Sequence, residues 1–281
     1  MGQELSRKIA IVTGGASGIG RATVELFLEE GASVVIADVD ATRGAELAAA
    51  SGAKARFKRT DVGNADDVQA LIDFTVSEFG GLHIMFNNAG IGGINANRFI
   101  DDELQDFQRV IDINLLGVML GSQRAARYMA KHGGGSIINT TSISALKAGF
   151  GVMTYRVSKA AVVHFTKCIA IDFAEYGVRV NCIAPGNIPT GMLAAAPDMT
   201  PATFERVTAA IRKVRMAGQP LQRQGTSRDV ANAALYLASD RAAQVTGLVL
   251  PVDGGITAGD PVNNNKVIME ARTRAMDQDE G

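Results

Sequence analysis

A glycine-rich turn near the start of the chain separates a short apolar run from a segment of helical composition. The β-branched run at residues 8–13 leads into Gly-Gly-Ala-Ser-Gly-Ile-Gly at residues 14–20, and the helical segment at 21–30 stops at Gly31. Glycines let backbone N–H groups approach a pyrophosphate closely, and the positive end of the following helix favours its charge. This order of strand, turn and helix predicts a dinucleotide-binding unit.

An acidic residue ends the next predicted strand. Residues 33–37 are Ser-Val-Val-Ile-Ala, and Asp38 follows them, eighteen residues beyond the last glycine of the turn. A carboxylate at this place accepts hydrogen bonds from both adenosine ribose hydroxyls and repels a 2′-phosphate. Ser17 and Val39, near the expected phosphate, carry no basic group, and we interpret Arg43 as a solvated helix charge. We therefore expect NAD rather than NADP as the cofactor.

Tyr155 and Lys159 stand four residues apart in a segment, residues 154–176, that is predicted to be one long helix. They would lie one turn apart on the same face. The ordinary pKa of tyrosine is about 10, and a neighbouring ammonium group together with an oxidised nicotinamide ring would lower it. Ser142 follows an apolar run at 136–141 and is placed to hydrogen-bond a substrate oxygen. The pattern predicts proton transfer through Tyr155, beside a dinucleotide.

Strand-like and helical segments alternate through the rest of the chain. Further strands are predicted at residues 82–86, 136–141, 178–183 and 247–252. Alternating strands and helices with short connections imply parallel strands joined by right-handed crossovers. We expect an α/β fold of the Rossmann-like, doubly wound type in a single domain.

The composition of the chain limits which classes of binding partner and which cellular locations we expect. The 281 residues carry a formal net charge of -1, from 28 basic and 29 acidic side chains, which argues against nucleic acid or an anionic membrane as a partner. The chain shows no bilayer-length apolar stretch and no room for a signal peptide before the first strand. Cys168 and Cys182 lie in apolar segments, and the three histidines are scattered. We expect a cytoplasmic protein with reduced cysteines and no metal site.

These motifs together resemble the classical short-chain dehydrogenase/reductase family over about residues 8–255. The matching positions are residues 13–20, 61–62, 87–90, Asn114, Ser142, Tyr155, Lys159, 185–186 and 253–255. The resemblance implies a seven-stranded parallel sheet in the order 3-2-1-4-5-6-7 with helices on both faces. It also implies an NAD-binding and catalytic domain at residues 1–259, followed by a C-terminal extension at 260–281.

The resemblance also implies roles for individual residues. Asn114, Ser142, Tyr155 and Lys159 would be catalytic, with Asn114 holding a water that links Lys159 to solvent. Lys159 would also bind the nicotinamide ribose, and Thr190 would meet the carboxamide. The residues expected to bind the cofactor are Gly14, Ser17, Gly18, Ile19, Gly20, Asp38, Asp61, Val62, Asn88, Ala89, Gly90, Tyr155, Lys159, Pro185, Gly186, Ile188 and Thr190.

Apolar side chains surround the expected point of hydride transfer. The residues expected to line the substrate pocket are Ile94, Leu146, Phe150, Met153, Met192 and Leu193. The stretch at about 187–224 is expected to act as a lid over this pocket. No arginine or lysine clearly marks a pocket for a substrate carboxylate or phosphate. Lys147 is the one ambiguous candidate for such a role. The lining therefore favours a hydrophobic small-molecule substrate, of which alicyclic and steroid-like molecules are examples.

Three functions fit these observations. The favoured one is an NAD-dependent dehydrogenase of a secondary alcohol or ketone. An NADP-linked carbonyl or acyl-carrier-protein reductase is an alternative, against which Asp38 argues. A non-catalytic nucleotide-sensing regulator is a third, although it would not need Ser142, Tyr155 and Lys159 intact.

Family resemblance further implies a homotetramer. Its contacts would use the helices near 101–131 and 154–176, and the last helix and strand near 227–252. We expect the helical part of the tail to lie near a neighbouring subunit or a substrate entrance.

Overall fold

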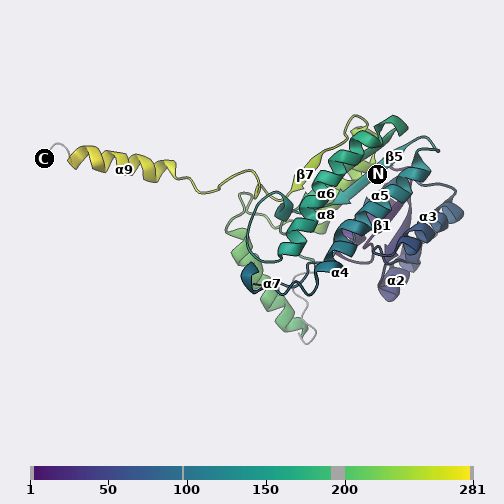
Figure 1. Cartoon of the computed structure of the whole chain (residues 1–281), viewed down its shortest axis with the longest axis horizontal. Coiled ribbons are helices and arrows are strands. Elements are labelled where there is room, and N and C mark those ends of the chain that lie inside the picture. The colour runs from purple at the N-terminus through teal and green to yellow at the C-terminus, as the bar shows by residue number, and fades with distance from the viewer. Residues whose placement is uncertain (1–2, 97, 191–199, 279–281) are drawn as a thin grey trace.

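A sheet of seven parallel strands forms the centre of the molecule (Figure 1). The computed structural model describes residues 3–96, 98–190 and 200–278. The strand order is β3-β2-β1-β4-β5-β6-β7, and every pair of neighbours is parallel. The strands are β1 Ile9–Thr13, β2 Ser33–Asp38, β3 Ala55–Arg59, β4 Ile84–Asn87, β5 Gly135–Thr140, β6 Val178–Pro185 and β7 Val249–Val252. The predicted fold class and strand order are confirmed.

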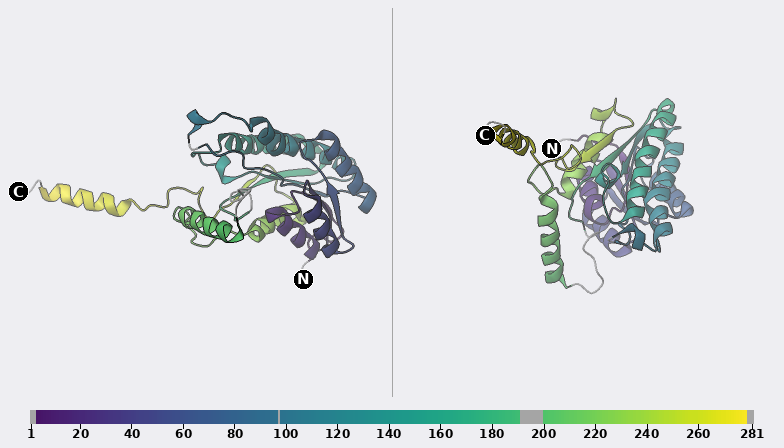
Figure 2. Two further views of the ribbon diagram at one scale, coloured as in Figure 1. Left: turned by 90° about the horizontal axis from the view of Figure 1, so that it is seen from below. Right: turned by 60° about the vertical axis from the view of Figure 1, so that its left-hand side comes forward.

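Helices cover both faces of the sheet. The helices are α1 Gly18–Glu29, α2 Ala41–Ser51, α3 Ala65–Phe79, α4 Phe107–Ile111, α5 Gly117–Met129, α6 Met153–Asp172, α7 Pro201–Met216, α8 Ser227–Ala238 and α9 Asn265–Gln278. The left view of Figure 2 shows the teal helices α5 and α6 on one side of the sheet, with α1 and α8 on the other.

The central strands are apolar on both faces because each face carries its own core. In β1, Ala10 and Val12 pack with residues of α1 and α8, whereas Ile11 packs with residues of α3, α5 and α6. All three side chains are fully buried. Burying a large aliphatic side chain contributes about 1.5–3 kcal/mol, so these alternating contacts hold the two helical layers on the sheet.

Strand β3 was not located by the sequence analysis, although seven strands were expected. Its sequence, Ala-Arg-Phe-Lys-Arg, carries three charges and forms one edge of the sheet. Arg56 Nε donates to Glu78 Oε2 of α3 at 2.8 Å. Phe57 packs so closely on α2 that a Cβ on Gly44 would overlap its ring. Charged side chains are common on edge strands, where they discourage pairing with another sheet.

The stretch predicted as helical near 101–131 is helical without a gap only from residue 107 to 129, and its hydrogen-bonding pattern changes within that run. A short 3₁₀ turn at Phe99–Asp101 is followed by α4, a π-helical turn at Asp112–Leu116, and then α5. A π-helical turn widens the helix by one residue, and such turns are frequent at functional sites. Here the turn contains the buried Asn114.

The C-terminal helix α9 extends away from the sheet (Figures 1 and 2). It lies within the extension predicted at 260–281, and its side chains are exposed from Asn265 to Asp277. The domain boundary near residue 259 stays a prediction.

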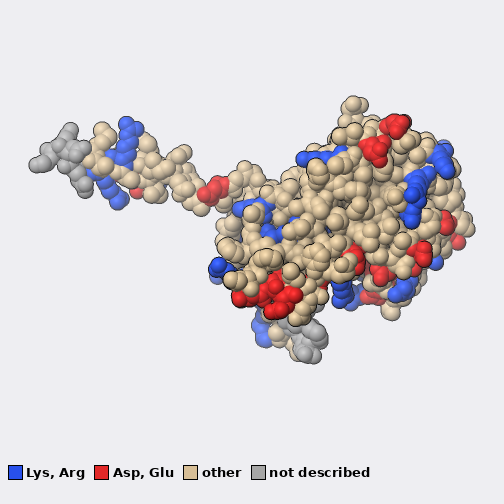
Figure 3. All heavy atoms as spheres, viewed as in Figure 1, with Lys and Arg blue, Asp and Glu red and all other residues tan. Residues whose placement is uncertain are grey.

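The face of the molecule that Figure 3 shows carries both basic and acidic side chains, with much uncharged surface between them. This distribution agrees with the formal net charge of -1. Of the helices that the structure describes, none combines the length and apolarity needed to cross a bilayer. A cytoplasmic location stays a prediction.

Candidate active site

The predicted catalytic and cofactor-binding residues gather at the carboxyl edge of the sheet. Thr13, Asn87, Thr140 and Pro185 are the last residues of β1, β4, β5 and β6, which are neighbours in the sheet. Because parallel strands end at the same edge, the loops that follow them meet there. In this class of sheet, ligands bind at that edge.

The glycine turn is tied to the carboxylate that ends β2. Asp38 Oδ2 accepts a hydrogen bond from Ala16 N at 3.0 Å, and its Oδ1 accepts one from Asp40 N at 3.1 Å. Gly14 and Gly18 have φ of 62° and 51°, in the left-handed region that favours glycine. A Cβ on Gly20 would overlap the Gly14 carbonyl. The turn therefore needs its glycines, and Asp38 lies beside it as expected.

The loop after β4 is bonded to the end of β1. Thr13 Oγ1 accepts hydrogen bonds from Asn88 N at 2.9 Å and from Ala89 N at 3.1 Å. Asn88 Nδ2 donates to Thr13 O at 3.0 Å. These bonds fix the predicted cofactor wall against the glycine turn.

Asn114 links that wall to α6. Its Oδ1 accepts from Ile91 N at 2.8 Å, and its Nδ2 donates to Ile91 O at 2.9 Å and to Ser158 Oγ at 3.2 Å. A Cβ on Gly90 would lie 3.1 Å from Asn114 Oδ1 and 3.3 Å from Lys159 Nζ. The structure thus brings Asn114, Gly90 and Lys159 together. A water held by Asn114 stays a prediction.

Lys159 is a buried cation at the centre of this group. Its side chain lies on α6 and the residue is 3% exposed. Its Nζ donates to Thr140 O at the end of β5, at 2.9 Å. Burial disfavours the charged form and lowers the pKa of Lys159 to about 8. Lys159 is therefore closer to neutrality at physiological pH than an ordinary lysine.

Tyr155 lies one turn before Lys159, and Lys159 Nζ is 5.9 Å from the centre of its ring. Burial raises the pKa of Tyr155, and this effect exceeds the lowering by the Ser142 side chain and the Arg156 charge. We expected Lys159 to lower this pKa. In the protein alone the direction is the opposite, because desolvation dominates and the opposing influences come from Ser142 and Arg156.

Ser142 completes the predicted catalytic group. It precedes a short 3₁₀ turn at Ile143–Ala145, and its Oγ accepts a hydrogen bond from Ser144 N at 3.1 Å. That bond uses an acceptor site of the hydroxyl, so its O–H can donate to a substrate oxygen.

Three of the predicted substrate-lining residues lie on two loops that contact each other, and Met153 begins α6. Ile94, Leu146 and Phe150 are exposed, and Met153 is half-buried. The Arg98 guanidinium lies 6.0 Å from the centre of the Phe150 ring, which joins the loop after β4 to the loop before α6. Met192 and Leu193 lie outside the described residues.

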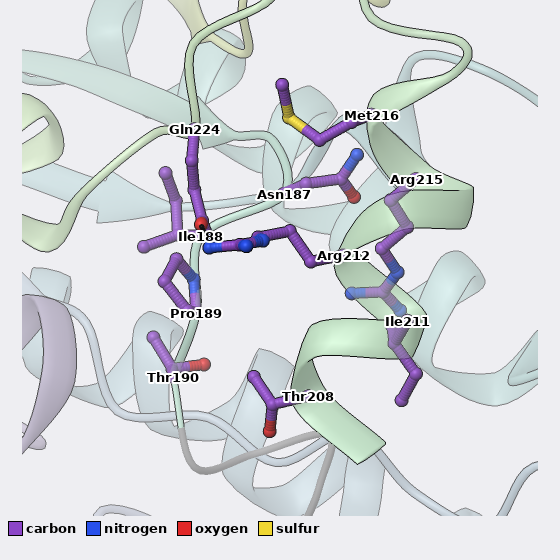
Figure 4. A pocket seen from close by; sticks show the side chains of 10 residues that line it. All are labelled: Asn187, Ile188, Pro189, Thr190, Thr208, Ile211, Arg212, Arg215, Met216 and Gln224. Atoms are coloured by element: carbon purple, nitrogen blue, oxygen red, sulfur yellow. Dashed lines mark hydrogen bonds between the residues drawn. The ribbon is translucent and has the colours of Figure 1, made fainter. Parts of the chain in front are cut away.

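A pocket of about 50 Å³ lies between α7 and the segment that follows β6 (Figure 4). Thr190 lines it, and a Cβ on Gly18 would lie 3.2 Å from Thr190 Cγ2, so the pocket adjoins the glycine turn. Arg212 and Arg215 line its other side, and Arg212 Nη1 donates to Gln224 Oε1 at 3.2 Å. Burial lowers the pKa of Arg215. These arginines carry no motif in the sequence, and their spacing of three residues, which places them on one helix face, is the signal that could have pointed to them.

The remaining predicted cofactor residues lie around the same edge. Ser17 precedes α1 and is exposed, and Ile19 is half-buried in the first turn of that helix. Asp61 is exposed and Val62 is buried against Gly117 of α5. Pro185 ends β6, and the residues expected after it are Gly186, Ile188 and Thr190. Within residues 3–96, 98–190 and 200–278, no group of three or more His, Cys, Asp or Glu side chains is placed to hold a metal ion.

The burial of Lys159 predicts a pH-dependent stability. Between pH 8 and 10.5 the unfolded chain binds a proton at Lys159 that the folded chain has lost, so the free energy of unfolding rises with pH across this window. Lys159→Met should remove that dependence, so its stability relative to wild type should fall by up to about 3 kcal/mol from pH 7 to 10.5.

Urea unfolding at several pH values measures this difference. Lys167→Met, at an exposed lysine on the same helix, is the control and should show no such trend. A difference between Lys159→Met and wild type that stays constant over this range would contradict the prediction.

Comparison with known proteins identifies the family of the chain. The family model described as "Enoyl-(Acyl carrier protein) reductase" matches residues 14–257. Momilactone A synthase of Oryza sativa subsp. japonica is 41% identical over 256 residues, which cover 91% of this chain and 92% of that protein. Secoisolariciresinol dehydrogenase of Forsythia intermedia is 41% identical over 257 residues, covering 91% of each chain. (+)-Borneol dehydrogenase 2 of Salvia officinalis is 42% identical over 259 residues, covering 89% of each chain.

Among solved structures, a short-chain type dehydrogenase/reductase from Mycobacterium marinum superposes with a TM-score of 0.82. It is 35% identical, and the match covers 92% of this chain and 98% of that one. The fold, the arrangement of Ser142, Tyr155 and Lys159, and these relatives lead to one conclusion: the chain belongs to the short-chain dehydrogenase/reductase family.

Proposed function

We propose that the protein is an NAD-dependent dehydrogenase that interconverts a secondary alcohol and a ketone on a hydrophobic, alicyclic or steroid-like substrate. The observation that carries the proposal is the meeting of Ser142, Tyr155 and the buried Lys159 where β5 ends and α6 begins. A regulator that only senses nucleotides would not need a proton-transfer group at this place. The intact group therefore favours an enzyme.

The residues around the glycine turn fit a dinucleotide. The turn is a cradle that side chains would fill, since a Cβ on Gly14 would lie 3.0 Å from Ala89 Cα. The first N–H groups of α1 follow it and suit a pyrophosphate. A bound nicotinamide cofactor would supply the chemistry of hydride transfer to and from the alcohol carbon.

The chain's own residues handle the proton. Ser142 would hold the substrate oxygen by a hydrogen bond, and Tyr155 as phenolate would take the proton from the alcohol. The Lys159 ammonium, 5.9 Å from the centre of the Tyr155 ring, would favour the phenolate together with the positive charge that an oxidised nicotinamide would supply. In ketone reduction the same proton returns from Tyr155 to the oxygen.

Asp38 supports NAD as the cofactor, since its carboxylate lies beside the turn. One observation favours the NADP-linked reductase instead. Arg43 pairs with Asp40, with Nε and Oδ2 at 3.4 Å, and lines a pocket of about 220 Å³ together with Ala16 and Arg21. Arg43 is exposed on α2, as expected for a solvated helix charge, and Glu46 lines the same pocket. Two guanidinium groups here would suit a 2′-phosphate.

Two observations support a hydrophobic substrate. Ile94, Leu146 and Phe150 present exposed apolar surface on the loops that follow β4 and precede α6, and Ser142 and Tyr155 flank the second of these loops. The names of several relatives are those of dehydrogenases, among them secoisolariciresinol dehydrogenase and (+)-borneol dehydrogenase 2. Purified protein with NAD should be assayed against secondary alcohols, hydroxysteroids and cyclic diols.

Tyr155→Phe should abolish turnover while leaving cofactor binding intact, because only the transferred proton is lost. We expect kcat below about a tenth of wild type and a Kd for NADH within about threefold. Tyr176→Phe, at an exposed tyrosine after α6, is the matched control and should behave as wild type. Activity of Tyr155→Phe above that limit would refute the assignment.

Asp38→Ala should shift the preference from NAD towards NADP by at least about tenfold in kcat/KM, which is about 1.4 kcal/mol. The change removes the repulsion of a 2′-phosphate and weakens the ribose hydrogen bonds. Arg43→Ala separates the two candidates, because it should leave kcat/KM with NAD unchanged and weaken any use of NADP. A wild-type protein that already prefers NADP would overturn the NAD proposal.

We also propose that the protein is a homotetramer. Exposed apolar side chains lie on helices α5, α6 and α9, and the larger ones are Met119, Val157, Ile171, Val267, Ile268, Met269 and Met276. Exposed apolar surface of this kind suits contact between subunits. Light scattering at micromolar concentration should give four times the chain mass of 29.5 kDa. A monomer mass would refute the assembly, and truncation after Gly259 without loss of mass or activity would refute a role for the tail.

A further inference from the structure

One arginine next to the catalytic tyrosine binds three carbonyl groups of a single loop. Arg156 Nε donates to Gly151 O at 3.1 Å, Nη1 donates to Lys147 O at 3.2 Å, and Nη2 donates to Phe150 O at 3.0 Å. A guanidinium group offers five N–H donors in one rigid plane, which lets it hold several acceptors at once. A lysine ammonium at this position could not match that geometry.

The loop is shaped around this side chain. It connects the short turn after Ser142 to the start of α6, and a Cβ on Gly149 would lie 2.8 Å from Arg156 Nη2. Gly151 has φ of 67° and Val152 has φ of 42°. The left-handed region is unfavourable for a β-branched residue such as Val152, so surrounding contacts must hold it there. The three bonds from Arg156 are such contacts.

The same loop carries two of the side chains expected to meet the substrate. Phe150 is 78% exposed and Leu146 is 40% exposed. The loop also contacts the segment after β4, since a Cβ on Gly151 would overlap the Asn95 side chain and Arg98 lies over the Phe150 ring. Arg156 therefore controls where Phe150 stands relative to Ser142 and Tyr155.

We propose that Arg156 is a positioning residue that determines substrate specificity by holding the loop at 147–151 so that Phe150 contacts a bulky apolar substrate. This inference rests on the proposed dehydrogenase function. Arg156 acts through the loop and touches none of the reacting atoms. Its side chain bonds the carbonyls of Lys147, Phe150 and Gly151, so its effect should depend on substrate size.

The first test compares a bulky alicyclic alcohol with a small one, 2-propanol, using NAD and the full chain. At a pH above the midpoint of the rise in kcat/KM for each protein, Arg156→Met should lower kcat/KM for the bulky alcohol by at least about tenfold, mainly through KM, while the value for 2-propanol changes by less than about threefold. Arg156→Lys should fall between Arg156→Met and wild type. The Kd for NADH should not change. Lys167→Met, an exposed lysine on the same helix, is the control and should match wild type.

A double-mutant cycle tests whether Arg156 acts through Phe150. Phe150→Ala should reproduce the loss of selectivity, and Arg156→Met combined with Phe150→Ala should be no worse than either single variant. Additive losses would overturn the proposed route. Equal losses for both alcohols, or a weakened affinity for NADH, would show a general structural role and overturn the specificity proposal.

The pH profile gives a second readout. The groups that face Tyr155 are Ser142, Arg156 and Lys159, and the charge of Arg156 lowers the pKa of Tyr155. Removing that charge should move the rise of kcat/KM for alcohol oxidation to higher pH. An unchanged or lowered midpoint in Arg156→Met would contradict the placement of the guanidinium beside the catalytic group.

Hydrogen exchange separates failure of this inference from failure of the proposed function. If the wild-type protein oxidises no secondary alcohol, the dehydrogenase proposal is wrong, and the specificity proposal falls with it. The loop geometry can still be judged, because amides at 147–152 should exchange faster in Arg156→Met than in wild type and in Lys167→Met. Equal exchange in the three proteins would overturn the claim that Arg156 holds the loop.

Discussion

Burial of one ammonium group organises the proposed catalytic edge of this protein. Lys159 is held by a hydrogen bond to Thr140 O, and Thr141 Oγ1 donates to Lys159 O at 2.7 Å, so β5 and α6 are joined twice at the same point. A buried cation is expensive unless it is partnered, which restricts what can surround it. A Cβ at residue 90 would approach Lys159 Nζ closely, so glycine suits this position. Asn114 forms hydrogen bonds to the backbone N–H and carbonyl of Ile91, the next residue. The position of Tyr155 follows from the same helix.

Two basic residues on α6, Lys159 and Arg156, have different surroundings and make different contacts. Lys159 points into the protein, where burial lowers its pKa, and Arg156 holds a loop whose carbonyls it bonds. Tyr155 lies on the same helix, 5.9 Å from Lys159 Nζ at its ring centre, and its pKa is raised by burial and lowered in part by the Arg156 charge. A phenol of this kind is a weak proton carrier until further positive charge approaches it. Cofactor binding and proton transfer would then be linked through charge.

Parts of the fold that depend on local pattern could be predicted. Apolar strands such as β1 and β6 stand out because both of their faces are buried. The edge strand β3 was missed because its charged side chains look like those of a loop. The π-helical turn around Asn114 was missed as well, since a π turn has no distinctive composition. Arg212 and Arg215 line a pocket only because α7 packs beside the segment after β6, and this contact cannot be seen in the sequence.

The sequence by itself determined the class of the fold, the glycine turn with Asp38 beyond it, and the trio of Ser142, Tyr155 and Lys159. Periodicity, glycine spacing and residue type are local properties, so they can be seen without coordinates. Only the tertiary structure decided the pKa directions of Tyr155 and Lys159 and the partners of Arg156. Desolvation and hydrogen bonding depend on which distant segments pack around a group, and that packing exists only in the folded chain.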